Sequence, residues 1–422
     1  MIRKNLYKRT VIDGLRIVSE KVPGFKSASI GAFLLTGVRD EDDENLGITH
    51  FIEHMIFKGT EKRSSYEISR EIEDRGGIID AFTAKEMMAI YSKILGEDVK
   101  IAIDVIGDLF SNPLFKEEDI EREKNVVIEE YKEFLDDPEE VLHSTLYESL
   151  FPFHPLSKEI LGKEETIKNF TREKVLNYWR KIFFPKNFLI IGVGDIEHEE
   201  FVEETLKNFK FKKETELIFK KEYPFEKPIP KLKIYPHLNQ IQCIIAFRTF
   251  GFKDKRRYHL MVSNSVIGAN MSSRLFQKLR EEKGLVYSIS SFVDFHRDAG
   301  IFGISFSTDP KSLKETIITL KEEINLLKEK GLEEKELERA KSFSLGHLAI
   351  SLENTETRLI RLANLEIYLE KYLEVEEVIN EIKNIKLKEI NETLYEIIDK
   401  ERMGISLCSP SEKYFDILNL IF

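Results

Sequence analysis

The sequence predicts an α+β protein made of two lobes that are joined by a linker. Its 422 residues exceed one ordinary domain. Segments with strand-like alternation and segments with helical periodicity follow each other in both halves of the chain. Between the halves, a stretch rich in lysine, glutamate and proline is typical of a semi-rigid linker. We therefore expect lobes over 1–211 and 232–422, with the linker over 212–231.

The first lobe is expected to open with a β-hairpin and to mix strands with helices after it. Asp13-Gly14 between two alternating runs is a strong hairpin signal. Gly76-Gly77 and Asn112-Pro113 each mark the end of a helix. Together these signals predict strands over 9–12, 15–19, 27–35, 78–82, 87–94 and 187–193, and helices over 48–57, 65–75, 99–110, 117–135, 141–150 and 172–183.

The second lobe is expected to repeat the first. Its pattern predicts strands over 241–247, 286–294 and 300–306, and helices over 257–267, 273–282 and 312–330. The segment that starts at 338 resembles the one at 121, an offset of 217 residues. A weak match between two helices can arise by chance, but the parallel order of elements favours a duplication. Glu123 and Glu130 would then correspond to Ala340 and His347, so the second lobe lacks these carboxylates.

Composition excludes several classes of protein. The net charge is −11, from 64 lysines and arginines against 75 acidic residues, which disfavours nucleic acid as a partner. No apolar run reaches 18 residues, so no membrane span is expected. The only cysteines, Cys243 and Cys408, are far apart and form no disulfide framework. These observations favour a cytoplasmic protein.

The chemistry is expected at His50-Phe51-Ile52-Glu53-His54. Positions i and i+4 share one face of a helix, so both imidazoles can bind one tetrahedral ion. Glu53 lies on the same side and can stand beside an open coordination position. This H-x-x-E-H order is the reverse of the commoner zincin motif. The ordinary alternative is two histidines packed on a helix face beside an unrelated glutamate.

A catalytic zinc needs a third protein ligand, and the acidic helix at 117–135 offers candidates. At roughly 100° per residue, one face of this helix holds Glu123, Val126, Val127, Glu130 and Phe134. A carboxylate on an apolar stripe is costly unless it is paired or coordinating. Glu130 is therefore the best third ligand, and Glu123 a group that could orient a ligand. The alternative for both is a partly exposed carboxylate in a charge-rich helix.

Four segments together resemble the pitrilysin, or insulinase-like (M16), family of zinc metallopeptidases. They are His50–His54 with its continuation to 60, the run 121–130 whose last glutamate lies 76 residues after His54, the stretch 76–83, and the stretch 280–287. The match extends over nearly the whole chain and points to the family's small, processing-peptidase-like branch.

The resemblance implies a fold and an assembly. Each of two homologous lobes would be an antiparallel sheet packed with helices, with one Zn²⁺ per chain in the first lobe. The second would be a zinc-free copy that supplies Arg280 and Tyr287 to stabilise an oxyanion. An ordinary structural role is the alternative for these two residues. The small branch also implies a homodimer.

The stretch 76–83 resembles the family's substrate-binding edge strand. The residues that would bind substrate are Ile79, Asp80, Ala81, Phe82 and Thr83. A peptide would add to this strand through main-chain hydrogen bonds, which favours extended, unfolded substrates. The family commonly has asparagine where this chain has Asp80. The extra carboxylate could change substrate preference, or it could be a local hydrogen-bonding swap without effect.

The function expected from these residues is that of a zinc-dependent endopeptidase acting on short or unfolded peptides. His50, His54 and Glu130 would hold the metal, which lowers the pKa of a bound water. Glu53 would act as general base and then as general acid, and Glu123 would orient a ligand. The alternatives are a non-catalytic scaffold subunit of the same fold and a zinc hydrolase that is not a peptidase.

Overall fold

A computed structural model describes residues 6–211 and 223–420, which form two compact units. Within the described residues, unit 1 contains 6–133, 158–211 and 351–372, and unit 2 contains 134–157, 223–350 and 373–420. The sequence predicts two contiguous lobes, whereas the units exchange one segment in each direction. Of the predicted linker, 212–222 lies outside the described residues, and 223–231 belongs to unit 2.

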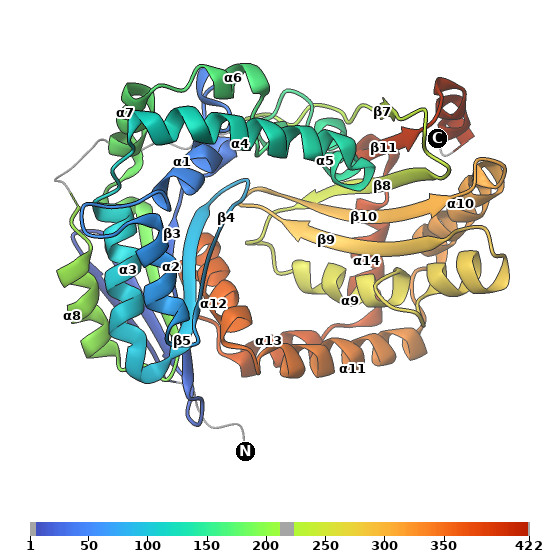
Figure 1. Ribbon diagram of the computed structural model, residues 1–422. Helices are drawn as coiled ribbons and strands as arrows, with labels where there is room; N and C mark the ends of the chain where they lie inside the picture. Colours follow the sequence, from blue (N-terminus) through green and yellow to red (C-terminus); the bar gives the residue numbers. More distant parts are fainter. Residues whose placement is uncertain (1–5, 212–222, 421–422) are drawn as a thin grey trace. The chain divides into compact units, whose positions relative to one another are not determined.

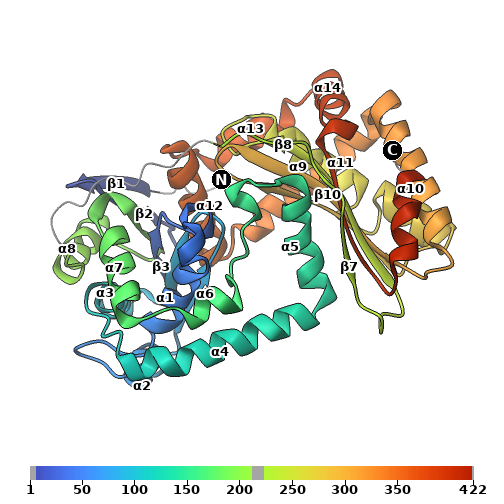
Figure 2. The same ribbon diagram turned by 90° about the horizontal axis from the view of Figure 1, so that it is seen from above.

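Unit 1 is built on a six-stranded sheet in the order β1-β2-β6-β3-β5-β4. Its strands are β1 (Leu6–Ile12), β2 (Leu15–Lys21), β3 (Ser27–Leu34), β4 (Ile78–Thr83), β5 (Met88–Leu95) and β6 (Phe188–Gly194). All pairings are antiparallel except that of β2 with β6, because the chain returns to the sheet through a long helical connection. Figure 2 shows β1 at one end of this sheet, and β4 forms the other end.

Helices cover both faces of this sheet (Figure 1). On one side lie α1 (Ile48–Ile56), α2 (Ser65–Glu73), α3 (Val99–Ser111), α4 (Glu117–Asp136), α6 (Glu164–Lys168), α7 (Arg172–Ile182) and α8 (His198–Asn208). On the other side α12 (Thr355–Asn364) packs on β3 and β6. Leu359 of α12 is fully buried beside Gly31 and Phe33 of β3. This double cover explains why β3 is buried along almost its whole length rather than at alternate residues.

Unit 2 contains a five-stranded sheet in the order β7-β11-β8-β10-β9. Its strands are β7 (Lys231–Ile234), β8 (Ile241–Phe250), β9 (Ser288–Phe295), β10 (Ala299–Thr308) and β11 (Met403–Ser409). The order matches β2-β6-β3-β5-β4 of unit 1 strand for strand, and β7–β11 is the parallel pair. Its helices are α5 (Pro138–Leu150), α9 (Arg257–Ile267), α10 (Leu313–Lys330), α11 (Glu334–Ser351), α13 (Val375–Lys383) and α14 (Leu387–Ile397). The shared strand order supports the predicted duplication.

The duplication also explains the exchanged segments. Helices α4 and α11 begin 217 residues apart, and so do α5 and α12. Helix α5, from the first half of the chain, packs on β8 and β11 of unit 2, while α12, from the second half, packs on the equivalent β3 and β6 of unit 1. Each unit therefore completes its core with a helix from the other half, which no contiguous boundary can describe.

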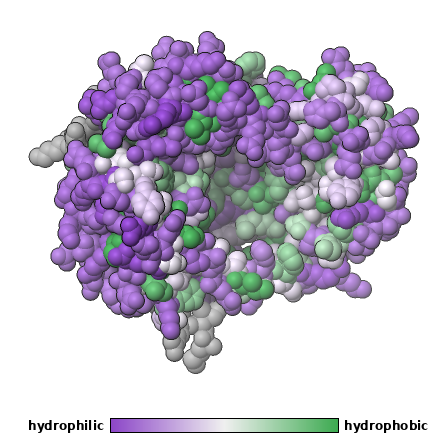
Figure 3. Space-filling view, viewed as in Figure 1, coloured by the Kyte–Doolittle hydropathy of each residue, from purple (hydrophilic) through white to green (hydrophobic). Residues whose placement is uncertain are grey.

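The predicted α+β class with two sheets in two lobes is confirmed. Sequence reasoning did not identify α6, α8, α12, α13, α14, β7 or β11, and it expected purely antiparallel sheets. The helix predicted over 273–282 contains a π-helical turn, Phe276–Glu282. On the face shown in Figure 3, hydrophilic residues cover most of the surface. Within the described part of the chain, no helix is both long enough and apolar enough to cross a membrane.

Candidate metal centre

Helix α1 carries the H-x-x-E-H motif and is held firmly at its N-terminus. Gly47, with φ of +86°, begins the helix in the left-handed region. The buried carboxylate of Glu41 accepts the backbone N–H groups of Gly47, at 2.7 Å, and Thr49, at 2.8 Å. A negative charge at this end of a helix is favourable because it meets free N–H groups and the positive end of the dipole. Phe51 and Ile52 on the inner side of α1 are fully buried, which fixes the direction in which the motif faces.

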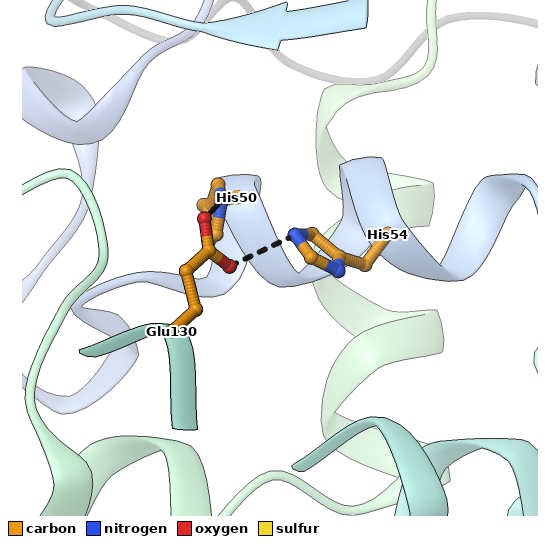
Figure 4. Close-up of side chains that lie close together, drawn as sticks. All are labelled: His50, His54 and Glu130. Carbon is orange, nitrogen blue, oxygen red and sulfur yellow. Dashed lines mark ion pairs between the residues drawn. The ribbon is translucent and has the colours of Figure 1, made fainter. Parts of the chain in front are cut away.

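The three predicted ligands meet in unit 1. His50 Nε2 lies 3.6 Å from Glu130 Oε1, and His54 Nε2 lies 3.3 Å from Glu130 Oε2. One ligand atom from each residue lies within 4.8 Å of the others. Figure 4 shows the two imidazoles of α1 directed at the Glu130 carboxylate. Among the described residues, this is the one group of three or more His, Cys, Asp or Glu side chains with such spacing.

The donor set fits a zinc ion. Two imidazoles and one carboxylate are the ligands of a catalytic zinc site that keeps its fourth position open. The buried Oε2 of Glu130 has no hydrogen-bond donor in the structure, although buried carboxylate oxygens normally have one. A cation at this point would satisfy that oxygen. Zinc therefore suits the residues present.

Glu123 supports the second histidine from behind. Its Oε1 lies 2.9 Å from His54 Nδ1, and its Oε2 accepts from Lys58 Nζ at 2.7 Å. Glu123 and Val127 of α4 are buried, whereas Val126 is 50% exposed, so the buried stripe is narrower than the predicted face. Burial raises the pKa of Glu123, but bonds to His54 and Lys58 outweigh it, and the net direction is downward. The carboxylate is therefore ionised and can orient His54.

The cluster polarises its own members. Burial, with the neighbouring charge of His54, lowers the pKa of His50 to about 4. Burial also acts to lower the pKa of His54, but the contact with Glu123 and the negative charges of Glu123 and Glu130 raise it to about 9. The neighbouring ring of His54, with that of His50, lowers the pKa of Glu130. At neutral pH His50 is thus a neutral imidazole and Glu130 an anion, the forms that bind metals.

Glu53 is half-buried on α1 and is held by β4. The hydroxyl of Thr83 donates a hydrogen bond to Glu53 Oε2. Burial raises the pKa of Glu53, and the negative charges of Glu130 and Asp80 raise it further. The hydrogen bond from Thr83 and the charge of His54 act to lower it, but the net shift is upward. A carboxylate with a raised pKa is suited to accept and return a proton near neutral pH.

The predicted substrate strand is β4, the terminal strand of the unit 1 sheet. Ile79 and Ala81 pack against the core on the face that α1 and α2 cover, and Thr83 lies on that face by alternation. Asp80 and Phe82 therefore point to the opposite face.

Arg280 and Tyr287 belong to unit 2. Arg280 is exposed within the π-helical turn, with its guanidinium 4.9 Å from the centre of the Phe276 ring. Tyr287 is 72% exposed immediately before β9, and its backbone N–H bonds Ser307 O at 2.9 Å. A single π-turn often marks a functional position. The part of these two residues in catalysis stays a prediction.

Sequence reasoning missed three residues that hold the centre in place. They are Glu41 at the start of α1, Lys58 beside Glu123, and Thr83 as the partner of Glu53. Glu41 lies in an acidic patch just before a predicted helix, so the preference for acids at helix N-termini could have identified it. The contacts of Lys58 with Glu123 and of Thr83 with Glu53 join residues far apart in sequence, so no local pattern predicts them.

Comparisons with known proteins match both halves of the chain to one family of peptidases. Residues 16–164 match the family described as insulinase (peptidase family M16), and 169–343 match the peptidase M16 inactive domain. The chain is 35% identical over 405 residues to "Uncharacterized zinc protease YmxG" of Bacillus subtilis (strain 168), covering 95% of this chain and 98% of that one. It is 31% identical over 394 residues to an "Uncharacterized zinc protease" of Rickettsia bellii (strain RML369-C), covering 93% and 95%.

Solved structures share the fold. A crystal structure of a protease from Helicobacter pylori superposes with a TM-score of 0.88 at 19% identity, covering 96% of this chain and all of that one. A peptidase M16 inactive domain from Pseudomonas fluorescens superposes with a TM-score of 0.87 at 17% identity, covering 96% and 98%. At these identities the likeness establishes the architecture and nothing about substrate.

Proposed function

Because the chain belongs to the insulinase family of peptidases, peptidase family M16, we propose that it is a zinc-dependent endopeptidase acting on short or unfolded peptides. The observation that carries the proposal is the convergence of His50, His54 and Glu130 with Glu53 beside them in unit 1. A non-catalytic relative would have no reason to keep all four side chains together.

In this proposal His50, His54 and Glu130 hold one Zn²⁺ per chain. When bound, the ion supplies Lewis acidity and lowers the pKa of water. Glu53 takes a proton from the attacking water and delivers it to the leaving amine. Thr83 holds the Glu53 carboxylate on one side, and Glu123 holds the ring of His54 in a single orientation.

We propose that substrate adds to β4 as an extended strand, with Ile79, Asp80, Ala81, Phe82 and Thr83 along it. Terminal strands present free N–H and C=O groups that pair with an added peptide whatever its sequence. The bond from Thr83 to Glu53 links this strand directly to the general base. Arg280 and Tyr287 would stabilise the oxyanion, since a guanidinium and a phenol are strong donors.

Location and assembly are further parts of the proposal. Cys243 and Cys408 are buried free thiols, which supports a reducing compartment such as the cytoplasm. A homodimer stays a prediction, and light scattering would test it.

The test compares four chains: wild type, Glu53→Gln, Glu130→Gln and Glu133→Gln. Glu133 is an exposed residue one turn after Glu130 on α4, so it controls for loss of one charge there. We expect zinc by mass spectrometry in all except Glu130→Gln, and cleavage of unfolded peptides only by wild type and Glu133→Gln. Undiminished cleavage by Glu53→Gln would refute the mechanism, and zinc-loaded wild type that cleaves no peptide would favour the scaffold alternative.

A further inference from the structure

The open edge of β4 offers a defined set of backbone groups. The N–H of Ala84 donates to Met87 O at 2.7 Å and closes the hairpin to β5. Residues of an antiparallel pair alternate between bonded and non-bonded positions. From this bond and the register of β4 on β5, Asp80 and Phe82 pair with β5, whereas Ile79, Ala81 and Thr83 direct their N–H and C=O groups to the open edge. An added peptide would need these groups.

One of the open donors is already covered by a side chain. Oδ1 of Asp80 accepts the N–H of Ala81 at 2.8 Å, and Oδ2 accepts from the hydroxyl of Tyr91 at 3.2 Å. The Asp80 side chain is exposed, and among the described residues no lysine or arginine forms an ion pair with it. Asp80 thus places an unneutralised charge on the edge and caps the Ala81 donor.

The surroundings of Asp80 suit a long basic side chain. Ile78, 51% exposed, and Phe82 flank Asp80 on the same face of β4. Tyr91 lies behind, with its ring centre 6.2 Å from that of Phe82. Lysine and arginine combine an apolar stem with a charged end. The stem would cover these apolar side chains while the charge meets the carboxylate.

We propose that Asp80 makes the site selective for extended peptides that carry arginine or lysine at the residue opposite Asp80. This inference rests on the proposed function, because it requires a peptide strand on β4. To bind, any peptide must displace the Asp80 carboxylate from the Ala81 N–H. A neutral peptide gives nothing in return, whereas a basic one replaces that bond with a cross-strand ion pair, bidentate for arginine.

The strand geometry also fixes a spacing rule. Asp80 and Thr83 are three residues apart and so face opposite sides of the sheet. A basic side chain beside Asp80 must then be an odd number of residues from the peptide residue opposite Thr83, which holds Glu53. Arginine moved by one position would point to the other face and lose the contact.

The test uses zinc-loaded full-length chain with Glu53→Gln, so that peptides bind without turnover. Two labelled unfolded peptides differ at one residue, arginine or its neutral isostere citrulline, and arginine is scanned along the sequence. Binding is measured by fluorescence polarisation with Asp80 intact, with Asp80→Asn, with Asp80→Ala and with Glu203→Gln. Glu203 is an exposed acid of α8 and controls for net charge.

With Asp80 intact we expect about two- to fivefold tighter binding of the arginine peptide at alternate positions. Glu203→Gln should keep this preference and Asp80→Asn should abolish it. Asp80→Ala should also bind the citrulline peptide more tightly, because the Ala81 donor becomes free. The inference is overturned if Asp80→Asn still prefers the arginine peptide. It is also overturned if the chain with Asp80 intact binds neither peptide, or binds both equally. Selective binding without cleavage by the chain that retains Glu53 would instead refute the proposed peptidase activity alone.

Discussion

Nδ1 of His54 lies 2.9 Å from Oε1 of Glu123, and this contact decides how the histidine can bind a metal. An ionised carboxylate can only accept, so Nδ1 keeps its proton. The pKa of about 9 leaves Nε2 protonated as well at neutral pH, so a metal would bind in place of the Nε2 proton. Nε2 is the atom that faces Glu130. Glu123 therefore determines that His54 uses Nε2 to bind a metal together with Glu130.

Glu123→Gln should weaken zinc binding about 10- to 100-fold, because an amide orients His54 less strongly and raises its basicity less. Competition with a chromophoric chelator measures the affinity. Glu129→Gln, an exposed position on the same helix, is the control and should bind zinc as wild type does. Equal affinity in Glu123→Gln would show that the contact does not tune the metal.

Thr83→Val should move the acidic limb of the pH profile of kcat/KM to higher pH. The Thr83 hydrogen bond lowers the pKa of Glu53, whose net shift is upward because of burial. Without that bond the pKa of Glu53 rises further, so protonation removes the base at a higher pH. An unchanged acidic limb would mean that Glu53 is not the group whose protonation limits the rate.

Glu41→Gln should alter how stability depends on pH. Burial raises the pKa of Glu41 from 4.5 to about 7, against the opposing N–H groups of Thr49 and Gly47. A group with a raised pKa in the folded state contributes stability that is complete below pH 4.5 and is lost as the pH rises through 7. The difference in unfolding free energy between wild type and variant should therefore change between pH 5 and 8, by on the order of 3 kcal/mol. Parallel curves from urea denaturation would contradict this.

Arg358→Met should destabilise unit 1 by about 3–5 kcal/mol, because it leaves the Glu20 carboxylate buried without this cation. Arg358 of α12 lies 3.0 Å from Glu20 of β2, and Glu20 is fully buried. Lys388→Met removes an exposed cation from a 3.8 Å pair and should change stability by less than about 1 kcal/mol. Denaturant unfolding compares the two, and equal effects would show that the α12 ion pair is not stabilising.

Arg280→Ala and Tyr287→Phe should each lower kcat by about 10²- to 10³-fold, as loss of one oxyanion donor does. Both residues are in unit 2, away in sequence from the predicted ligands, so zinc content should not change. Arg339→Ala removes another exposed arginine of unit 2 and should leave kcat as in wild type. Zinc loss in Arg280→Ala would contradict the assignment.

The site was predictable to the extent that its parts are local. His50, Glu53 and His54 follow from one helical turn, and the phase of α4 selected Glu123 and Glu130. The bond from Thr83 to Glu53 was not predictable, since it joins a strand and a helix 30 residues apart. The role of Glu41 at the start of α1 could have been predicted from the preference for acids before a helix. It was missed because a loop separates Glu41 from the first residue of the helix.

The sequence alone determined the α+β class, the metal motif and the family, and it favoured a duplication, because periodicity, spacing and residue chemistry can be read along the chain. Only the tertiary structure decided which half completes each core. Helices α5 and α12 each pack on the sheet of the opposite unit, and only long-range contacts show this assignment. The same long-range contacts placed Thr83 on Glu53 and set the Asp80 carboxylate on the open N–H of Ala81, where register and sheet order, rather than local propensity, fix the neighbours.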